Sequence, residues 1–175
     1  RRALDVGATI LKMKNANPDV VIIAGPHVGN QAKLKKEALK LGWKSTFILS
    51  IHSADVAFPY LAGPAAEGDY VLCHYPLLDS GEPIVKEYAR VVKKSFPDAK
   101  LNTIAFSSFL HFKVTLDALQ RAGRNLTRER LVDVLEILRD PVRKNLYIPI
   151  GGQKRFGGVA YFFSQVKGGK FVKVT

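Results

Sequence analysis

The sequence predicts an α/β fold built around parallel strands. Through the first fifty residues, patterns typical of helix and strand alternate in the order helix, strand, helix, strand. This alternation indicates units in which each helix crosses over the sheet, in a right-handed sense, between parallel strands. The first predicted strand, Val20–Ala24, is a continuous apolar run, and such a run favours burial on both faces of a parallel sheet.

The elements up to residue 50 follow from apolar periodicity and from residues that end helices. The opening segment shows apolar residues at helical spacing after Asp5, which can cap a helix. Gly42 ends the next helical pattern. We expect a helix at Arg1–Asn15, a strand at Val20–Ala24, a loop at Gly25–Gly29, a helix at Asn30–Leu41 and a strand at Thr46–Ser50.

The remaining elements are predicted in the same way. Residues 53–69 are rich in Ala, Gly and Pro and indicate a short helix with a loop, and Gly168-Gly169 predicts a hairpin turn because glycine accepts positive φ. We expect a strand at Tyr70–Tyr75, a helix starting at Ser80–Pro83 and ending at Phe96–Asp98, a helix at Ile104–Arg121, a helix capped by Thr127 and ended by Asp140-Pro141, and strands at Val159–Val166 and Phe171–Val174.

Composition excludes several classes of protein. The formal net charge is +12, but the lysines and arginines are spread over several amphipathic helices, so we expect solvated helix faces and no nucleic-acid partner. No apolar stretch approaches the ~20 residues that a membrane span needs. The single cysteine, Cys73, lies in a predicted strand, where we expect a buried, unreactive thiol.

No catalytic, metal or cofactor site is predicted. The sequence contains no phosphate-binding loop, no metal-ligand spacing and no nucleophile elbow. His27 and His52 each follow the carboxyl end of a predicted parallel strand, where ligands bind in open α/β sheets. A histidine there can donate a hydrogen bond to a ligand oxygen or pair with a carboxylate. The alternative, two loop histidines that face only water, stays open.

Three segments and the tail carry a resemblance to a known family. These are Asn17–Gly25, Gln31–Gly42, Ala62–Gly68 and Tyr161–Val172. In this order they resemble the branched-chain amino acid substrate-binding proteins of ABC importers, which have the type I periplasmic-binding-protein fold. No single segment is specific, and the resemblance rests on the ordered series.

The resemblance implies two Rossmann-like lobes with parallel sheets, joined by a hinge, with a C-terminal β-hairpin. Residues 1–71 would form part of the second lobe, residues 72–157 part of the first, and residues 158–175 would return to the second. The opening helix has no strand before it to pack against, so we expect a C-terminal fragment of a longer protein.

The resemblance also implies a ligand wall made by the loops after the first two strands. The expected contacts are Gly25, Pro26, His27, Ile51, His52 and Ser53. Amino-acid binders of the family commonly place an aromatic residue near Pro26 and an acid at the position of Ile51. Because an ammonium group without a carboxylate is poorly compensated in a closed cleft, we expect a carboxylate or amide ligand in preference to a plain aliphatic amino acid.

The function implied is that of the extracytoplasmic solute-binding component of an ABC importer. Such a protein delivers a small solute to membrane permease subunits, without catalysis or a cofactor. It would be periplasmic or bound at the outer face of the membrane, as a secreted protein or a lipoprotein. The alternative is a ligand-sensing domain of a receptor, or an amide-responsive regulator, with the same fold.

Overall fold

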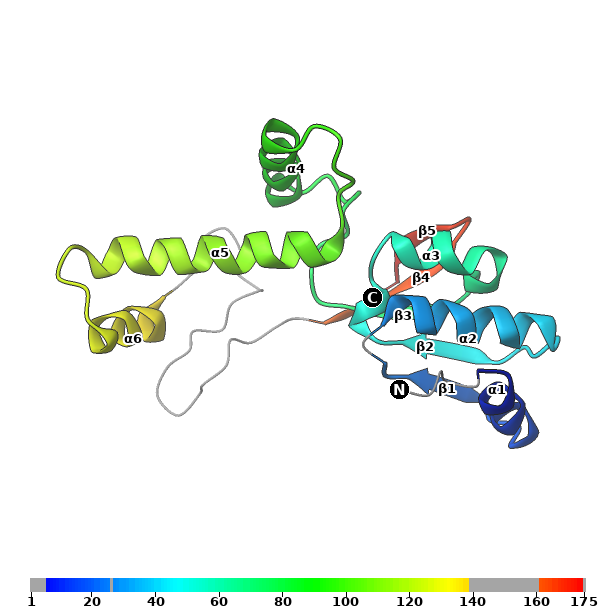
Figure 1. Ribbon diagram of the computed structural model, residues 1–175. Helices are drawn as coiled ribbons and strands as arrows, with labels where there is room; N and C mark the ends of the chain where they lie inside the picture. Colours follow the sequence, from blue (N-terminus) through cyan, green and yellow to red (C-terminus); the bar gives the residue numbers. More distant parts are fainter. Residues whose placement is uncertain (1–5, 26, 139–160, 175) are drawn as a thin grey trace. The chain divides into compact units, whose positions relative to one another are not determined.

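A computed structural model describes residues 6–25, 27–138 and 161–174 (Figure 1). The chain forms two compact units. Unit 1 comprises Arg1–Thr103 and Phe162–Thr175, and unit 2 comprises Ile104–Tyr161.

Unit 1 contains the sheet and most of the helices. In chain order its elements are α1 (Val6–Asn15), β1 (Val20–Ile23), α2 (Val28–Lys40), β2 (Thr46–Leu49), the 3₁₀ helix η1 (Ile51–Ser53), α3 (Ala57–Ala62), the 3₁₀ helix η2 (Gly63–Ala66), β3 (Tyr70–Cys73), α4 (Pro83–Ser95), β4 (Phe162–Lys167) and β5 (Lys170–Lys173). The predicted order of helices and strands is confirmed for the described residues. The first two residues of the predicted strand Val159–Val166 lie outside them.

The sheet of unit 1 has the strand order β1-β2-β3-β4-β5. Strands β1, β2 and β3 are parallel, with Ile23 opposite Leu49 at the end of the first pair. β4 runs antiparallel to β3, and β5 runs antiparallel to β4. The carboxyl ends of β1 and β2 therefore meet at one edge of the sheet, which is where ligands bind in open α/β sheets.

The core of unit 1 lies on one face of the sheet. Helices α2 and α3 contact each other and lie across this face (Figure 1). Buried side chains from the strands and from α1, α2 and α3 form a single apolar cluster there. The strand members alternate along each strand, as expected when one face is buried: Val21, Ile23, Phe47, Leu49, Val71, Cys73 and Val166.

The prediction that the first strand is buried on both faces is wrong for the described residues. Val21 and Ile23 are buried, but Val20 is 47% exposed and Ile22 is 71% exposed. The described helices α1, α2 and α3 contribute to the cluster on the Val21 side. The apolar sequence of β1 therefore did not show whether helices cover one face of the strand or both.

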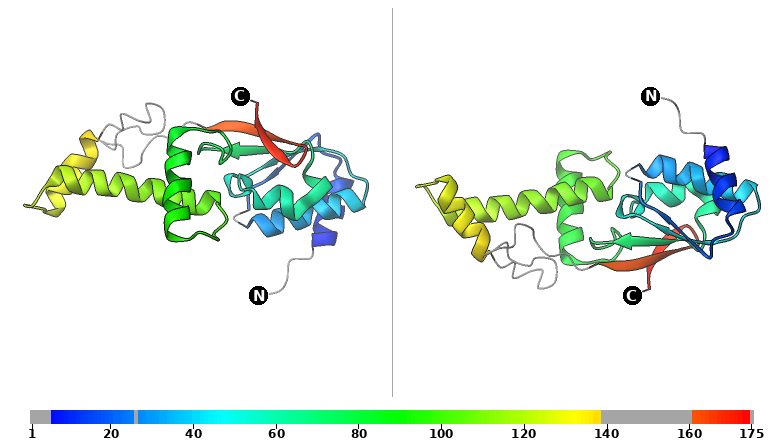
Figure 2. Two further views of the ribbon diagram at one scale, coloured as in Figure 1. Left: turned by 90° about the horizontal axis from the view of Figure 1, so that it is seen from above. Right: turned by 90° about the horizontal axis from the view of Figure 1, so that it is seen from below.

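The C-terminal hairpin is held to the loop before β3. The backbone N–H of Gly168 donates to the carboxylate of Glu67 at 3.0 Å, and Gln165 Nε2 donates to the carbonyl of Gly68 at 3.1 Å. The turn residues Gly168 and Gly169 have φ of 58° and 73°, so the prediction of a glycine turn is confirmed. Figure 2 shows the hairpin, in red, from two opposite sides.

Unit 2 contains α5 (Thr103–Ala122), which begins with the last residue of unit 1, and α6 (Arg128–Ile137). The predicted cap of α6 is confirmed, since the backbone N–H of Arg130 donates to Thr127 Oγ1 at 3.1 Å. Ala118, Ala122 and Val134 form a small buried cluster between the two helices. The predicted helix stop at Asp140-Pro141 lies outside the described residues.

Candidate functional site

Two loops come together at the carboxyl edge of the parallel strands. Gly25 lies two residues beyond the end of β1, and η1 begins two residues beyond the end of β2. The backbone N–H of Ser50 donates to the carbonyl of Ile23 at 3.1 Å. The ladder between the two strands therefore continues to the point where the loops begin, and this fixes the loops beside each other.

A buried glutamine joins the two loops. Gln31 lies in the first turn of α2 and is 1% exposed. Its Nε2 donates to the carbonyl of Gly25 at 2.5 Å and to Ser50 Oγ at 2.9 Å. Its Oε1 accepts a hydrogen bond from Ser53 Oγ at 2.7 Å. Ser50 Oγ in turn donates to the carbonyl of Gly25 at 2.9 Å, so one amide side chain connects both loops.

The structure brings two of the six predicted contact residues, Gly25 and Ser53, together through Gln31. Ser53 is fully buried and its hydroxyl is bound to that amide. His27 precedes the first residue of α2, is exposed, and makes no capping hydrogen bond through its side chain. On η1, Ile51 is half-buried and His52 is exposed. Pro26 lies outside the described residues.

The carboxylate nearest to η1 along the chain is bound by backbone groups. Asp55 is buried. Its Oδ1 accepts a hydrogen bond from the N–H of Ala57 at 2.8 Å, and its Oδ2 accepts one from the N–H of Thr103 at 2.6 Å. Thr103 Oγ1 donates to the carbonyl of Ala54 at 2.7 Å. Both oxygens of Asp55 therefore hold the chain segments that follow η1 and begin α5.

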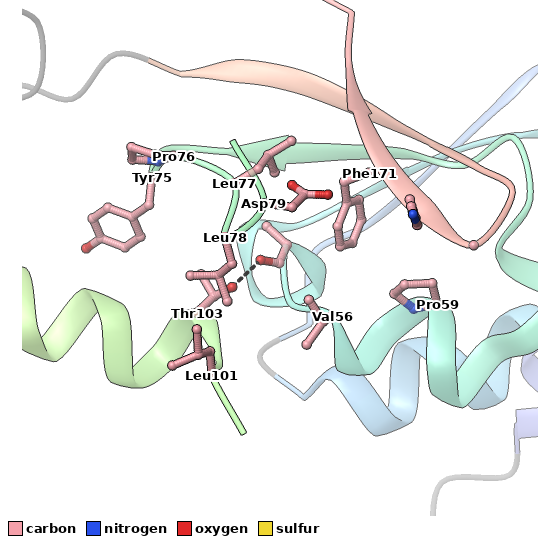
Figure 3. Close-up of a pocket in the computed structure, with 13 residues that line it drawn as sticks. Val56, Pro59, Tyr75, Pro76, Leu77, Leu78, Asp79, Leu101, Thr103 and Phe171 are labelled. Atoms are coloured by element: carbon pink, nitrogen blue, oxygen red, sulfur yellow. Dashed lines mark hydrogen bonds between the residues drawn. The ribbon is translucent and has the colours of Figure 1, made fainter. Parts of the chain in front are cut away.

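An apolar cavity of about 280 Å³ adjoins this region within unit 1 (Figure 3). It is lined by the segments that follow η1 and β3, from Ala54 and from Tyr75, and by Gly169–Phe171 of the hairpin. Most of the side chains that form its walls are apolar: Val56, Pro59, Leu77, Leu78, Leu101 and Phe171. Its volume approaches the roughly 300 Å³ at which small-molecule pockets begin.

A buried ion pair lies before the start of β3, at the amino end of the strand. Lys35 Nζ of α2 is 2.7 Å from Asp69 Oδ1, and both side chains are buried. Within the described residues, Asp69 Oδ2 has no hydrogen-bond partner. Burial raises the pKa of Asp69 to about 7, against the lowering effect of the Lys35 ammonium. Lys35 also lies over the ring of Phe47, at 3.5 Å from its centroid.

Cys73 is buried, as the sequence predicts. Its Sγ lies 3.4 Å from Ser164 Oγ of β4. Burial raises the pKa of the Cys73 thiol above its ordinary value, which keeps it in the unreactive thiol form. In the part of the chain that the structure describes, no cluster of metal-ligating side chains is found. Within the same residues, no helix is long and apolar enough to cross a membrane.

Three residues of the site were not predicted: Gln31, Ser50 and Thr103. Each makes a hydrogen bond to a residue at least 19 positions away, and spacing along the sequence does not reveal such partners. One signal was available for Gln31. It follows closely after the predicted loop Gly25–Gly29, at the start of a predicted helix. A polar side chain at such a position can hydrogen-bond to the backbone of the loop.

Comparison with known proteins identifies the fold. The structure is similar to that of a branched-chain amino acid ABC transporter from Thermus thermophilus with bound valine, with a TM-score of 0.84 and 21% identity. The match covers 98% of this chain and 49% of that one. An extracellular ligand-binding receptor from Rhodopseudomonas palustris matches with a TM-score of 0.82 and 20% identity, over 99% of this chain and 52% of that one. A leucine-binding protein from Thermotoga maritima matches with a TM-score of 0.73 and 20% identity, over 99% and 48%.

These matches confirm the expected type I periplasmic-binding-protein fold, of which the chain contains a part, since it spans about half the length of each of these structures. The expected resemblance to branched-chain amino acid binding proteins is confirmed as well. A search of curated proteins finds no match. The model of the family described as "Periplasmic binding protein" matches residues 2–170. The chain therefore belongs to the periplasmic binding protein family.

Proposed function

We propose that this chain supplies the C-terminal half of the solute-binding component of an ABC importer. The protein would capture a small solute outside the cytoplasm and deliver it to permease subunits in the membrane. Family membership supports the binding role. The likeness of the fold to a protein described as a branched-chain amino acid ABC transporter supports the transport role.

The proposed lobe assignment follows the family pattern. Residues 1–71 belong to the second lobe, residues 72–157 to the first, and residues 158–175 return to the second. The compact units of the structure divide after Thr103 and before Phe162. The proposal places residues 72–103 in the first lobe, whereas these residues belong to unit 1 with residues 1–71. A structure of the whole protein tests to which lobe they belong.

The observation that carries the proposal is the joining of two loops at the carboxyl edge of the sheet through Gln31. This edge is where open α/β sheets bind ligands. The joined loops carry the exposed side chains of His27 and His52, and the half-buried Ile51 lies between Ser50 and His52 in the chain. Gly25, Pro26 and Ser53 are the other residues of the proposed wall.

We further propose that the ligand is a small carboxylate or amide with an apolar body. The ammonium group of an amino acid needs a carboxylate in a closed cleft. Asp55 is the nearest acid after η1 along the chain, and backbone N–H groups already bind both of its oxygens. The half-buried Ile51 offers apolar surface for a hydrocarbon body, and so does the cavity whose lining begins at Ala54, at about 25 cal/mol per Å² buried. A histidine can donate a charge-assisted hydrogen bond to a carboxylate, worth about 1.5–3 kcal/mol.

Titration calorimetry on the full-length protein tests the binding role. We expect saturable, one-to-one binding of at least one small carboxylate or amide, and mass spectrometry should recover the solute unchanged. Chemical conversion of the solute would contradict the proposal. So would the absence of binding across carboxylates, amides and branched-chain amino acids.

A further inference from the structure

Gln31 is hydrogen-bonded through its side chain to both proposed ligand loops. It contacts the loop after β1 through the carbonyl of Gly25, and the loop after β2 through the hydroxyls of Ser50 and Ser53. The amide is 1% exposed, so water cannot replace these partners in the folded protein. An amide of this kind fixes the distance between the two loops.

The chemistry of the partners determines the orientation of the amide. The carbonyl of Gly25 can only accept a hydrogen bond, so the NH₂ group must face it, and the carbonyl oxygen Oε1 must face Ser53. Ser50 Oγ accepts a hydrogen bond from Nε2 and donates its hydroxyl hydrogen to the carbonyl of Gly25. Both amide hydrogens and both hydroxyl hydrogens are thus used inside the network, which leaves it one satisfied arrangement.

We propose that Gln31 is the positioning residue of the ligand site, which holds the loops of His27 and of Ile51–Ser53 as one preformed wall. This inference rests on the proposed function. Gln31 does not contact the solute itself. It reduces the conformational entropy that the two loops would otherwise lose when they bind the solute, and preorganisation of this kind raises affinity.

The variant Gln31→Met tests the inference, because methionine has a similar length and shape but cannot make the three hydrogen bonds. Gln165→Met is the matched control, since Gln165 also donates from Nε2 to a backbone carbonyl, that of Gly68, away from the ligand loops. Hydrogen exchange on the ligand-free, full-length protein is the first measurement. We expect faster exchange in residues 25–31 and 50–54 for Gln31→Met, and unchanged exchange there for Gln165→Met. Unchanged exchange in Gln31→Met would overturn the inference.

Affinity is the second measurement, with isocaproate as the probe because it is leucine without the ammonium group. We expect Gln31→Met to weaken binding by about tenfold or more, equivalent to about 1.4 kcal/mol, and Gln165→Met to leave it within about twofold. Faster exchange without any loss of affinity would also overturn the inference. If the wild-type protein binds none of the solutes tested, the proposed function fails, while hydrogen exchange still decides whether Gln31 orders the loops.

The conservative variant Gln31→Glu adds a test based on the pH dependence of hydrogen exchange, which a purely structural role of Gln31 would not affect. In Gln31→Glu, an ionised carboxylate still accepts from Ser53 but repels the carbonyl of Gly25. Burial raises the pKa of such a group, and the protonated form can again donate to Gly25. As the pH falls from about 8 to about 5, the buried carboxyl group should take up a proton. Protection of the loop amides against exchange should then recover in Gln31→Glu, whereas it should stay low in Gln31→Met. An identical pH response in both variants would contradict the assignment. If Gln31→Met fails to fold, Ser53→Ala is measured in its place, because it removes one hydrogen bond of the network.

Discussion

Thr103 binds Asp55, and the residue before it, through two hydrogen bonds that Thr103 donates. The N–H of Thr103 donates to Asp55 Oδ2 at 2.6 Å, and Thr103 Oγ1 donates to the carbonyl of Ala54, the residue before Asp55, at 2.7 Å. The loop that follows η1 is thereby tied to the first residue of α5. The two chain segments are 48 residues apart in sequence.

Substitution of Thr103 separates the hydroxyl bond from the backbone bond. Thr103→Val keeps the N–H but removes the donor to Ala54, so we expect a loss of about 1 kcal/mol in the free energy of unfolding. Thr103→Ser keeps both donors and should stay within about 0.5 kcal/mol of wild type. Urea unfolding measures both variants. Equal stability of the two would show that the hydroxyl bond contributes nothing.

The buried carboxyl group of Asp69 predicts a pH-dependent stability. Its pKa rises from 3.8 to about 7 on folding because of burial. Between these values the folded protein retains a proton that the unfolded chain releases, so the free energy of unfolding falls as the pH rises through this window. The fall should be on the order of a few kcal/mol. Asp69→Asn, which cannot titrate, should flatten this part of the curve of unfolding free energy against pH, and a curve as steep as that of wild type would contradict the assignment.

Removal of Lys35 should leave the Asp69 carboxyl group without its partner. We expect Lys35→Met to cost about 3–5 kcal/mol at pH values above 7, the usual range for a broken buried pair. The cost should be smaller near pH 5, since Asp69 is then protonated. The exposed neighbour on the same helix provides the control, and Lys36→Met should change stability by less than about 0.5 kcal/mol. Equal effects of the two variants in thermal or urea unfolding would contradict a role for the buried pair.

The chain alone should bind its solute more weakly than the full-length protein. The proposed ligand wall contributes one side of a two-lobed cleft, so the solute cannot be fully enclosed without the rest of the protein. Titration calorimetry with the same solute on both forms should show a difference of more than about tenfold. Equal affinities would contradict the two-lobed account.

The local elements were predictable because helix and strand signals act over a few residues. Gly42 ends α2 with a φ of 61° and Thr127 caps α6, as their residue types indicate. The start of α2 at Val28 was predicted two residues late, because His27 is not a usual capping residue whereas Asn30 is. The exposure of Ile22 could not be read from the apolar run, since it depends on which helices cover each face of the sheet.

The candidate site was predictable in part. The positions of His27 and His52 follow from parallel strands that end at one edge, which is a local rule combined with topology. The hydrogen bonds of Gln31, and the hydrogen bond from Thr103 to Asp55, join residues far apart in sequence. Such contacts require the folded backbone, and they bear on ligand chemistry because backbone N–H groups already bind each oxygen of Asp55.

The comparison of isocaproate with leucine on the full-length protein tests the central claim most directly. The two solutes share one carbon skeleton and differ only in the ammonium group. We expect isocaproate, or its amide, to give the larger thermal shift, and we expect Ile51→Glu to reverse this preference by supplying a carboxylate for the ammonium group. Larger shifts with leucine, isoleucine and valine, reduced by Ile51→Glu, would contradict this account of the ligand site.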